Sequence, residues 1–85
     1  MKKYRAIIKV QKIKTVANPE GKTIQEALKR LGYNNVDSLR TGKIFLVDMH
    51  AEDLSMAEKI ADEISKEILS NPIIEEYEIE LEEVQ

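Results

Sequence analysis

The chain contains no cysteine, no tryptophan and only one histidine. Without cysteine it can form neither disulfide bonds nor thiolate metal sites. Nucleophilic catalysis requires an activated serine, cysteine or lysine beside a base, and the single histidine, His50, stands alone at the end of a predicted strand. The three glycines are dispersed at positions 21, 32 and 42, so they form no phosphate-binding loop. We therefore expect no catalytic residue, no metal ion and no bound cofactor in this chain.

Aromatic residues and long apolar runs are also scarce. An RNA-binding sheet usually displays about two or three exposed aromatic side chains, whereas Tyr4 and Tyr77 fall on the predicted buried faces of their strands. The formal net charge of −3 also disfavours nucleic acid as a partner. No segment approaches the roughly 20 apolar residues of a transmembrane helix, and the basic start is not followed by a signal-peptide core. We expect a cytoplasmic protein that binds neither nucleic acid nor membranes.

At 85 residues the chain is long enough for one domain, which we place at residues 1–85. A chain of this size buries only about 60–65% of its unfolded surface, so a single monomeric core is marginal. Because disulfides and thiolate metal sites are excluded, the remaining sources of stability are good packing and self-association. We therefore expect a homodimer or a homotetramer.

Two amphipathic helices are predicted between strands of alternating pattern. Asn18 opens the first helix as its N-cap, and Gly32 closes it because glycine readily adopts the left-handed conformation needed there. An anion bound at this helix start is the alternative to simple capping. The second helix begins at Asp53 or Ser55 and stops at Asn71, before a proline.

The remaining elements define the fold class. Thr41-Gly42 is predicted to be the turn of a β-hairpin between strands at residues 36–40 and 43–49. The element order is then strand, helix, strand, strand, helix, strand. It predicts an α+β fold of the ferredoxin-like split βαβ class, with a four-stranded antiparallel sheet and two helices on one face.

The other sheet face is expected to be bare. Strand 43–49 is apolar on both sides as far as Asp48, so one of its faces needs cover from outside the domain. The apolar residues predicted to line the bare face are Ile7, Ile44 and Leu46. An exposed apolar patch usually marks an interface, and we therefore predict a protein contact there, with two sheets packed face to face.

Charge is divided between the two ends of the chain. Residues 2–14 carry six basic side chains and no acid, and residues 75–83 carry six glutamates and no base. One interpretation is that these two strands are neighbours whose exposed side chains attract. The other is that the acidic strand is an edge that meets a basic partner.

Three segments carry a family resemblance. They are NPEGKTIQEALKRLGY at residues 18–33, LRTGKIFL at 39–46 and LSNPIIEEY at 69–77. In this order and spacing they resemble the PurS family, the small subunit of bacterial and archaeal phosphoribosylformylglycinamidine (FGAM) synthase. Asn18 stands where the family commonly has aspartate, and both residues cap a helix.

The resemblance implies a non-catalytic subunit that brings together a large synthetase subunit (PurL) and a glutaminase subunit (PurQ) in purine biosynthesis. The glutaminase releases ammonia from glutamine. The synthetase, which uses ATP and Mg²⁺, converts formylglycinamide ribonucleotide (FGAR) to FGAM. A different class of function, a stand-alone small-ligand regulatory domain, is suggested by fold analogy and by Gly21 in the loop before the first helix.

Basic residues beside the predicted hairpin turn are candidate partner contacts. Arg40 and Lys43 flank Thr41-Gly42, where long side chains project without a core role and can pair with carboxylates. A solvated hairpin tip explains them equally well. Asn71, at the corner before the last strand, is a further candidate, although ending the helix already explains it.

Overall fold

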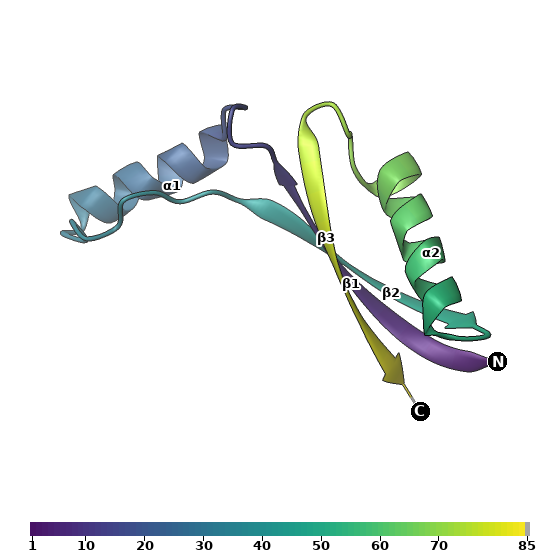
Figure 1. The fold of residues 1–85 in the computed structure, drawn as a ribbon. Coiled ribbons are helices and arrows are strands. Elements are labelled where there is room, and N and C mark those ends of the chain that lie inside the picture. Colours follow the sequence, from purple (N-terminus) through teal and green to yellow (C-terminus); the bar gives the residue numbers. More distant parts are fainter. Residues whose placement is uncertain (85) are drawn as a thin grey trace.

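The computed structural model describes residues 1–84. They form β1 (Lys2–Lys12), α1 (Pro19–Arg30), β2 (Gly42–Ala51), α2 (Leu54–Ile64), the π-helical segment η1 (Ser65–Leu69) and β3 (Glu75–Val84). The strands make one antiparallel sheet in the order β2-β1-β3 (Figure 1). α2 packs across one face of this sheet, whereas α1 lies beyond its end. The architecture is α+β, as expected.

Two finer expectations about the fold are wrong. Residues 36–40 form no strand, so the sheet of residues 1–84 has three strands instead of four, and the outer edge of β2 is free. α1 does not lie beside α2 on the sheet (Figure 1). The physical reason is a polar network that replaces the predicted hairpin. Arg40 donates to carbonyls of the β1–α1 loop, and Thr41 bonds to Asn18 at the start of α1.

The ends of α1 follow the predicted capping chemistry. The side-chain oxygen of Asn18 accepts from the Gly21 N–H at 2.9 Å. At the other end Gly32 has a φ of 95°. Tyr33 N–H donates to the Leu28 carbonyl, and Gly32 N–H to the Lys29 carbonyl. This is the bond pattern of a Schellman cap, and it satisfies carbonyls that the last helical turn leaves without partners.

The core is small and contains several alanines. One cluster joins Ala6, Ile8 and Val10 of β1 to Ala61 of α2. A second joins Tyr4 of β1 to Ala51 and Ala57. Alanines on α2 let the helix backbone approach the sheet closely, but they bury little apolar area, so the core stabilises this chain only modestly.

The end of the second helix differs from its predicted pattern. The helical spacing of Ala57, Ile60, Ala61 and Ile64 continues to Ile68 and so predicts that residue on the buried side of the helix. Ile68 is instead 75% exposed, while Leu69 packs against the core. The cause is the π-helical turn of η1, which inserts one residue per turn and rotates the following side chains. Within it, buried Ser65 donates from its hydroxyl to the Ala61 carbonyl at 2.7 Å.

The segregated charges meet within the sheet. β1 lies between the other two strands, and its basic side chains pair with glutamates of β3. Lys9 Nζ lies 3.3 Å from Glu80, and Lys2 Nζ lies 3.7 Å from Glu83. The interpretation of the two strands as neighbours is confirmed. Because these pairs are exposed, each contributes about 0–1 kcal/mol to stability, and they serve mainly to favour this strand pairing.

Candidate protein-interaction surface

The sheet face opposite α2 carries an apolar patch. Side chains alternate along β1 and β2, so the residues facing away from Ala6 and Ile8 form the open face. Ile7 is directly paired with Leu46 across the two strands, and Ile44 is paired with Lys9. Ile44 is 63% exposed and Leu46 67% exposed. The structure therefore places the three predicted residues, Ile7, Ile44 and Leu46, together on one face.

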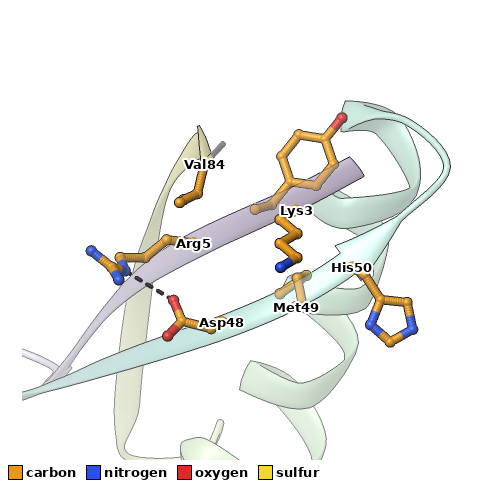
Figure 2. A pocket seen from close by; sticks show the side chains of 7 residues that line it. Lys3, Arg5, Asp48, Met49, His50 and Val84 are labelled. Carbon is orange, nitrogen blue, oxygen red and sulfur yellow. Dashed lines mark hydrogen bonds and ion pairs between the residues drawn. The ribbon is translucent and has the colours of Figure 1, made fainter. Parts of the chain in front are cut away.

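Charged side chains on this face pair with one another. Arg5 Nε donates to the Asp48 carboxylate at 2.9 Å (Figure 2). The guanidinium also lies 3.9 Å from Glu82. The hydrogen bond to Asp48, followed by the attraction of its charge, raises the pKa of Arg5. His50 lies apart from this pair at the end of β2 (Figure 2). Because these charges are paired across the strands, the apolar patch beside them is the part of the face left without a partner.

Arg40 is held inside a loop corner. Its Nη2 atom donates to the carbonyls of Lys12, Ile13 and Val16 at 3.3, 3.1 and 3.0 Å. Its Nε is buried and has no hydrogen-bond partner among the described residues. The guanidinium therefore ties the loop between β1 and α1 to the segment that precedes β2. Sequence reasoning missed this role, because a basic residue beside a turn has the same local pattern whether it points outward or inward.

Asn18 completes the same corner. Its side-chain nitrogen donates to the Thr41 carbonyl at 3.1 Å, and its side-chain oxygen accepts from the Thr41 hydroxyl at 3.0 Å. A Cβ on Gly21 would lie 2.6 Å from the Leu39 carbonyl oxygen, so glycine is required by close packing there. This packing accounts for Gly21 without a small ligand. The corner fixes α1 to the chain through polar contacts.

Lys43 and Asn71 lie at separate places on the surface. Lys43 is exposed at the start of β2. Asn71 organises the corner before β3: its side-chain oxygen accepts from Ile73 N–H at 3.1 Å, and its carbonyl accepts from Glu75 N–H at 2.7 Å. The corner presents Ile73, which is 81% exposed. The six predicted contact residues therefore form three groups: the open face with Ile7, Ile44 and Leu46, the α1 corner with Arg40 and Lys43, and the Asn71 corner.

Across residues 1–84, no three His, Cys, Asp or Glu side chains converge in a way that could hold a metal ion. None of the described helices has both the length and the apolar character needed to cross a membrane.

The arrangement defines a class of protein: a small α+β module whose open apolar sheet face and projecting helix suit association with other proteins. The family model of PurS, phosphoribosylformylglycinamidine (FGAM) synthase, matches residues 5–83. The chain belongs to the PurS family of FGAM synthase subunits.

Relatives agree over nearly the whole chain. The FGAM synthase subunit PurS of Methanocaldococcus jannaschii is 39% identical over 82 residues, which cover 96% of this chain and 99% of the relative. The crystal structure of PurS from Thermus thermophilus aligns with a TM-score of 0.87 at 32% identity, covering 98% of this chain and 99% of that one. A chain in the structure of PurLQS from Thermotoga maritima aligns with a TM-score of 0.85 at 33% identity, covering 99% and 100%.

Proposed function

We propose that this chain assembles the glutaminase PurQ and the ATP-dependent synthetase PurL into a glutamine-dependent FGAM synthase. The observation that carries this proposal is the full-length match to a chain of the PurLQS complex from Thermotoga maritima. PurQ releases ammonia from glutamine, and PurL uses ATP and Mg²⁺ to convert FGAR to FGAM. The chain itself supplies contact surface and holds no substrate. We place the complex in the cytoplasm.

We also propose that the chain self-associates as a dimer or a tetramer. The support is the apolar patch of Ile7, Ile44 and Leu46, because an exposed group of this kind in a small protein usually marks a contact. Lys43 and the Asn71 corner are exposed and remain available to partner subunits.

The central experiment compares two nitrogen sources. Purified PurL and PurQ are assayed for FGAM formation with glutamine and, separately, with ammonium chloride, each with and without this chain. We expect the glutamine-dependent rate to need the chain and the ammonia-dependent rate to be nearly the same without it. Equal glutamine-dependent rates with and without the chain would refute the assembly role.

Variants then locate the contacts. Leu46→Glu places a charge in the open face, and we expect it to weaken self-association at least tenfold. Lys43→Glu reverses the charge at the start of β2, and we expect a higher concentration of the chain to be needed for half-maximal glutamine-dependent activity. Lys59→Glu is the matched control, since Lys59 is an exposed lysine on α2, away from both the open face and the α1 corner. Ammonia-dependent activity should stay unchanged in all three.

A further inference from the structure

We propose that the corner of residues 68–74, between η1 and β3, is the docking point for the synthetase subunit PurL, which receives its exposed isoleucines in an apolar socket rimmed by basic side chains. The inference rests on the assembly role proposed above and names the surface that performs it. The corner leads into β3, which forms the opposite edge of the sheet from β2. It is therefore separate from both the β2 edge and the open face of Ile7, Ile44 and Leu46.

The corner exposes apolar side chains that the chain's own fold leaves uncovered. Ile73 is 81% exposed, Ile68 is 75% exposed, and Ile74 is 36% exposed. A single exposed apolar side chain is common in soluble proteins and needs no explanation. Three branched aliphatic residues in one short corner are different, because an exposed apolar group usually marks a contact with another protein.

The π-helical turn of η1 is what turns Ile68 outward. An α-helical continuation places Ile68 on the buried side, four residues after Ile64, whereas η1 places Leu69 against the core instead. Ser70 holds this turn, because its N–H and its hydroxyl both donate to the Ser65 carbonyl, at 2.9 and 2.8 Å. π-helical turns are rare and occur frequently at functional sites. The chain therefore adopts an uncommon helical turn whose effect is to leave Ile68 on the surface.

Hydrogen bonds fix the shape of the corner around Ile73. The Asn71 side-chain oxygen accepts from Ile73 N–H at 3.1 Å, and the Asn71 carbonyl accepts from Glu75 N–H at 2.7 Å. The Glu75 carboxylate in turn accepts from Asn71 N–H at 2.7 Å. Ile13 N–H donates to the Ile74 carbonyl at 2.9 Å, which joins the corner to the end of β1. A surface held in this way loses little conformational entropy when it is bound, so it suits docking without rearrangement.

The charges around the corner indicate the chemistry of its partner. Residues 67–85 contain seven glutamates and no basic residue. In the sheet Glu75 is paired with Lys12, but Glu76 is paired with Gln11. Within residues 1–84, neither Glu67 nor Glu76 takes part in an ion pair. Two such corners repel each other, so a second copy is a poor occupant, whereas an apolar socket with lysine or arginine at its rim is complementary.

Of the two partner subunits, PurL fits this chemistry better than PurQ. In the proposed reaction PurL binds ATP and the ribonucleotide FGAR, both of which carry phosphate groups. Proteins bind phosphate with arginine and lysine, and the field of such residues attracts acidic surfaces. The substrate of PurQ is glutamine, which has no net charge. An acidic rim around an apolar tip is therefore directed to PurL.

The first test titrates variants of this chain into PurL and PurQ with FGAR, ATP, Mg²⁺ and glutamine. Ile73→Lys changes a side chain that is 81% exposed, so folding and the mass by light scattering should match wild type. We expect the concentration of chain needed for half-maximal glutamine-dependent activity to rise about tenfold or more. Glu76→Lys, which reverses a charge at the rim, should raise it about threefold. Met56→Lys is the matched control, because Met56 is 42% exposed at the opposite end of α2; it should behave like wild type.

The outcomes separate this inference from the assembly role. If the glutamine-dependent rate needs the chain but Ile73→Lys leaves the half-maximal concentration unchanged, the corner is overturned and the assembly role stands. An effect of Ile73→Lys without any effect of Glu76→Lys overturns the basic rim. A glutamine-dependent rate that does not need the chain overturns both proposals.

The second test identifies the protein at the corner. The chain has no cysteine, so a benzophenone attached to Glu67→Cys, next to Ile68, reports from this corner alone. We irradiate the labelled chain in the same mixture and identify the cross-linked protein by mass spectrometry. A cross-link to PurL that becomes weaker when the labelled chain also carries Ile73→Lys supports the proposal. Cross-links only to PurQ or to a second copy, or none in a mixture that keeps its glutamine-dependent activity, overturn it.

Discussion

Replacing Arg40 tests how the chain positions α1. Arg40→Met keeps most of the aliphatic length and removes the donors to the carbonyls of Lys12, Ile13 and Val16. Nη2 has two hydrogens for these three acceptors, so about two full bonds are lost. A hydrogen bond from a charged donor contributes about 1.5–3 kcal/mol, which gives about 3–6 kcal/mol in total.

Two effects reduce that figure. The Nε of Arg40 is buried and has no hydrogen-bond partner within residues 1–84. An unpaired buried donor destabilises the folded chain by about 1–3 kcal/mol, and methionine removes that donor. The loop carbonyls are only partly buried, so water replaces some of the lost donors. We therefore expect Arg40→Met to lower the free energy of unfolding by about 2 kcal/mol. For a domain of this size the melting temperature falls by about 8–16 °C.

The assay is urea unfolding at one fixed protein concentration, because self-association shifts apparent stability. Arg40→Lys is the matched variant. A lysine ammonium has three hydrogens for three converging carbonyls. We therefore expect Arg40→Lys to lower the free energy of unfolding by less than half as much as Arg40→Met. If the free energy of unfolding of Arg40→Met lies within about 0.5 kcal/mol of the wild-type value, the structural role of Arg40 is wrong. A stable Arg40→Met protein that fails to support glutamine-dependent activity would instead identify Arg40 as a partner contact.

Two further predictions concern the α1 corner and the α2–β3 contact. Gly21→Ala puts a Cβ 2.6 Å from the Leu39 carbonyl oxygen. We expect the free energy of unfolding, measured in urea, to be about 1–3 kcal/mol lower than in wild type. An unchanged free energy of unfolding would mean that the corner is loosely packed. The Tyr77 hydroxyl donates to Asp62 at 2.6 Å, and this hydrogen bond, with smaller effects of burial and charge, raises the pKa of Tyr77 above its usual 10.0. A raised phenol pKa means that the stabilisation is complete below pH 10 and is lost as pH rises through the folded-state pKa. Stability measured by urea unfolding should therefore fall more steeply above pH 10 in wild type than in Tyr77→Phe, and identical slopes would contradict the assignment.

Local signals predicted much of this structure. Asn18 and Gly32 marked the two ends of α1. The alternating pattern that predicted Tyr4 on a buried strand face holds along β1, where Ala6, Ile8 and Val10 are also buried. The same alternation placed Ile7 and Leu46 on the opposite face, where they are now directly paired. These features depend on a few neighbouring residues and on the two-residue period of a strand, so the sequence was sufficient.

The errors came from contacts between distant segments. Arg40 and Thr41 bond to residues 23–28 positions earlier in the chain, and no local pattern distinguishes that arrangement from a hairpin turn. Ile68 was misplaced because a π-helical turn has no clear sequence signal, yet it shifts the helical face by one residue. The position of α1 beyond the sheet follows from the Arg40 corner, so one missed network accounts for both the absent fourth strand and the displaced helix.

The charge pattern and the Arg40 corner together determine which edges of the sheet stay uncovered. Basic side chains of β1 pair with glutamates of β3 and so favour β3 as its neighbour. The remaining glutamates of β3 favour leaving the outer edge of β3 in solvent. The predicted fourth strand would have covered the other edge, along β2. The Arg40 corner diverts that segment to hold α1 outward and so leaves the β2 edge free. The same contacts therefore withhold a strand from the chain's own sheet and hold α1 away from it. Arg40→Met should accordingly loosen α1 as well as weaken folding, so hydrogen exchange of the α1 amides should be faster in this variant than in wild type. Unchanged exchange in α1 would mean that Arg40 does not position the helix.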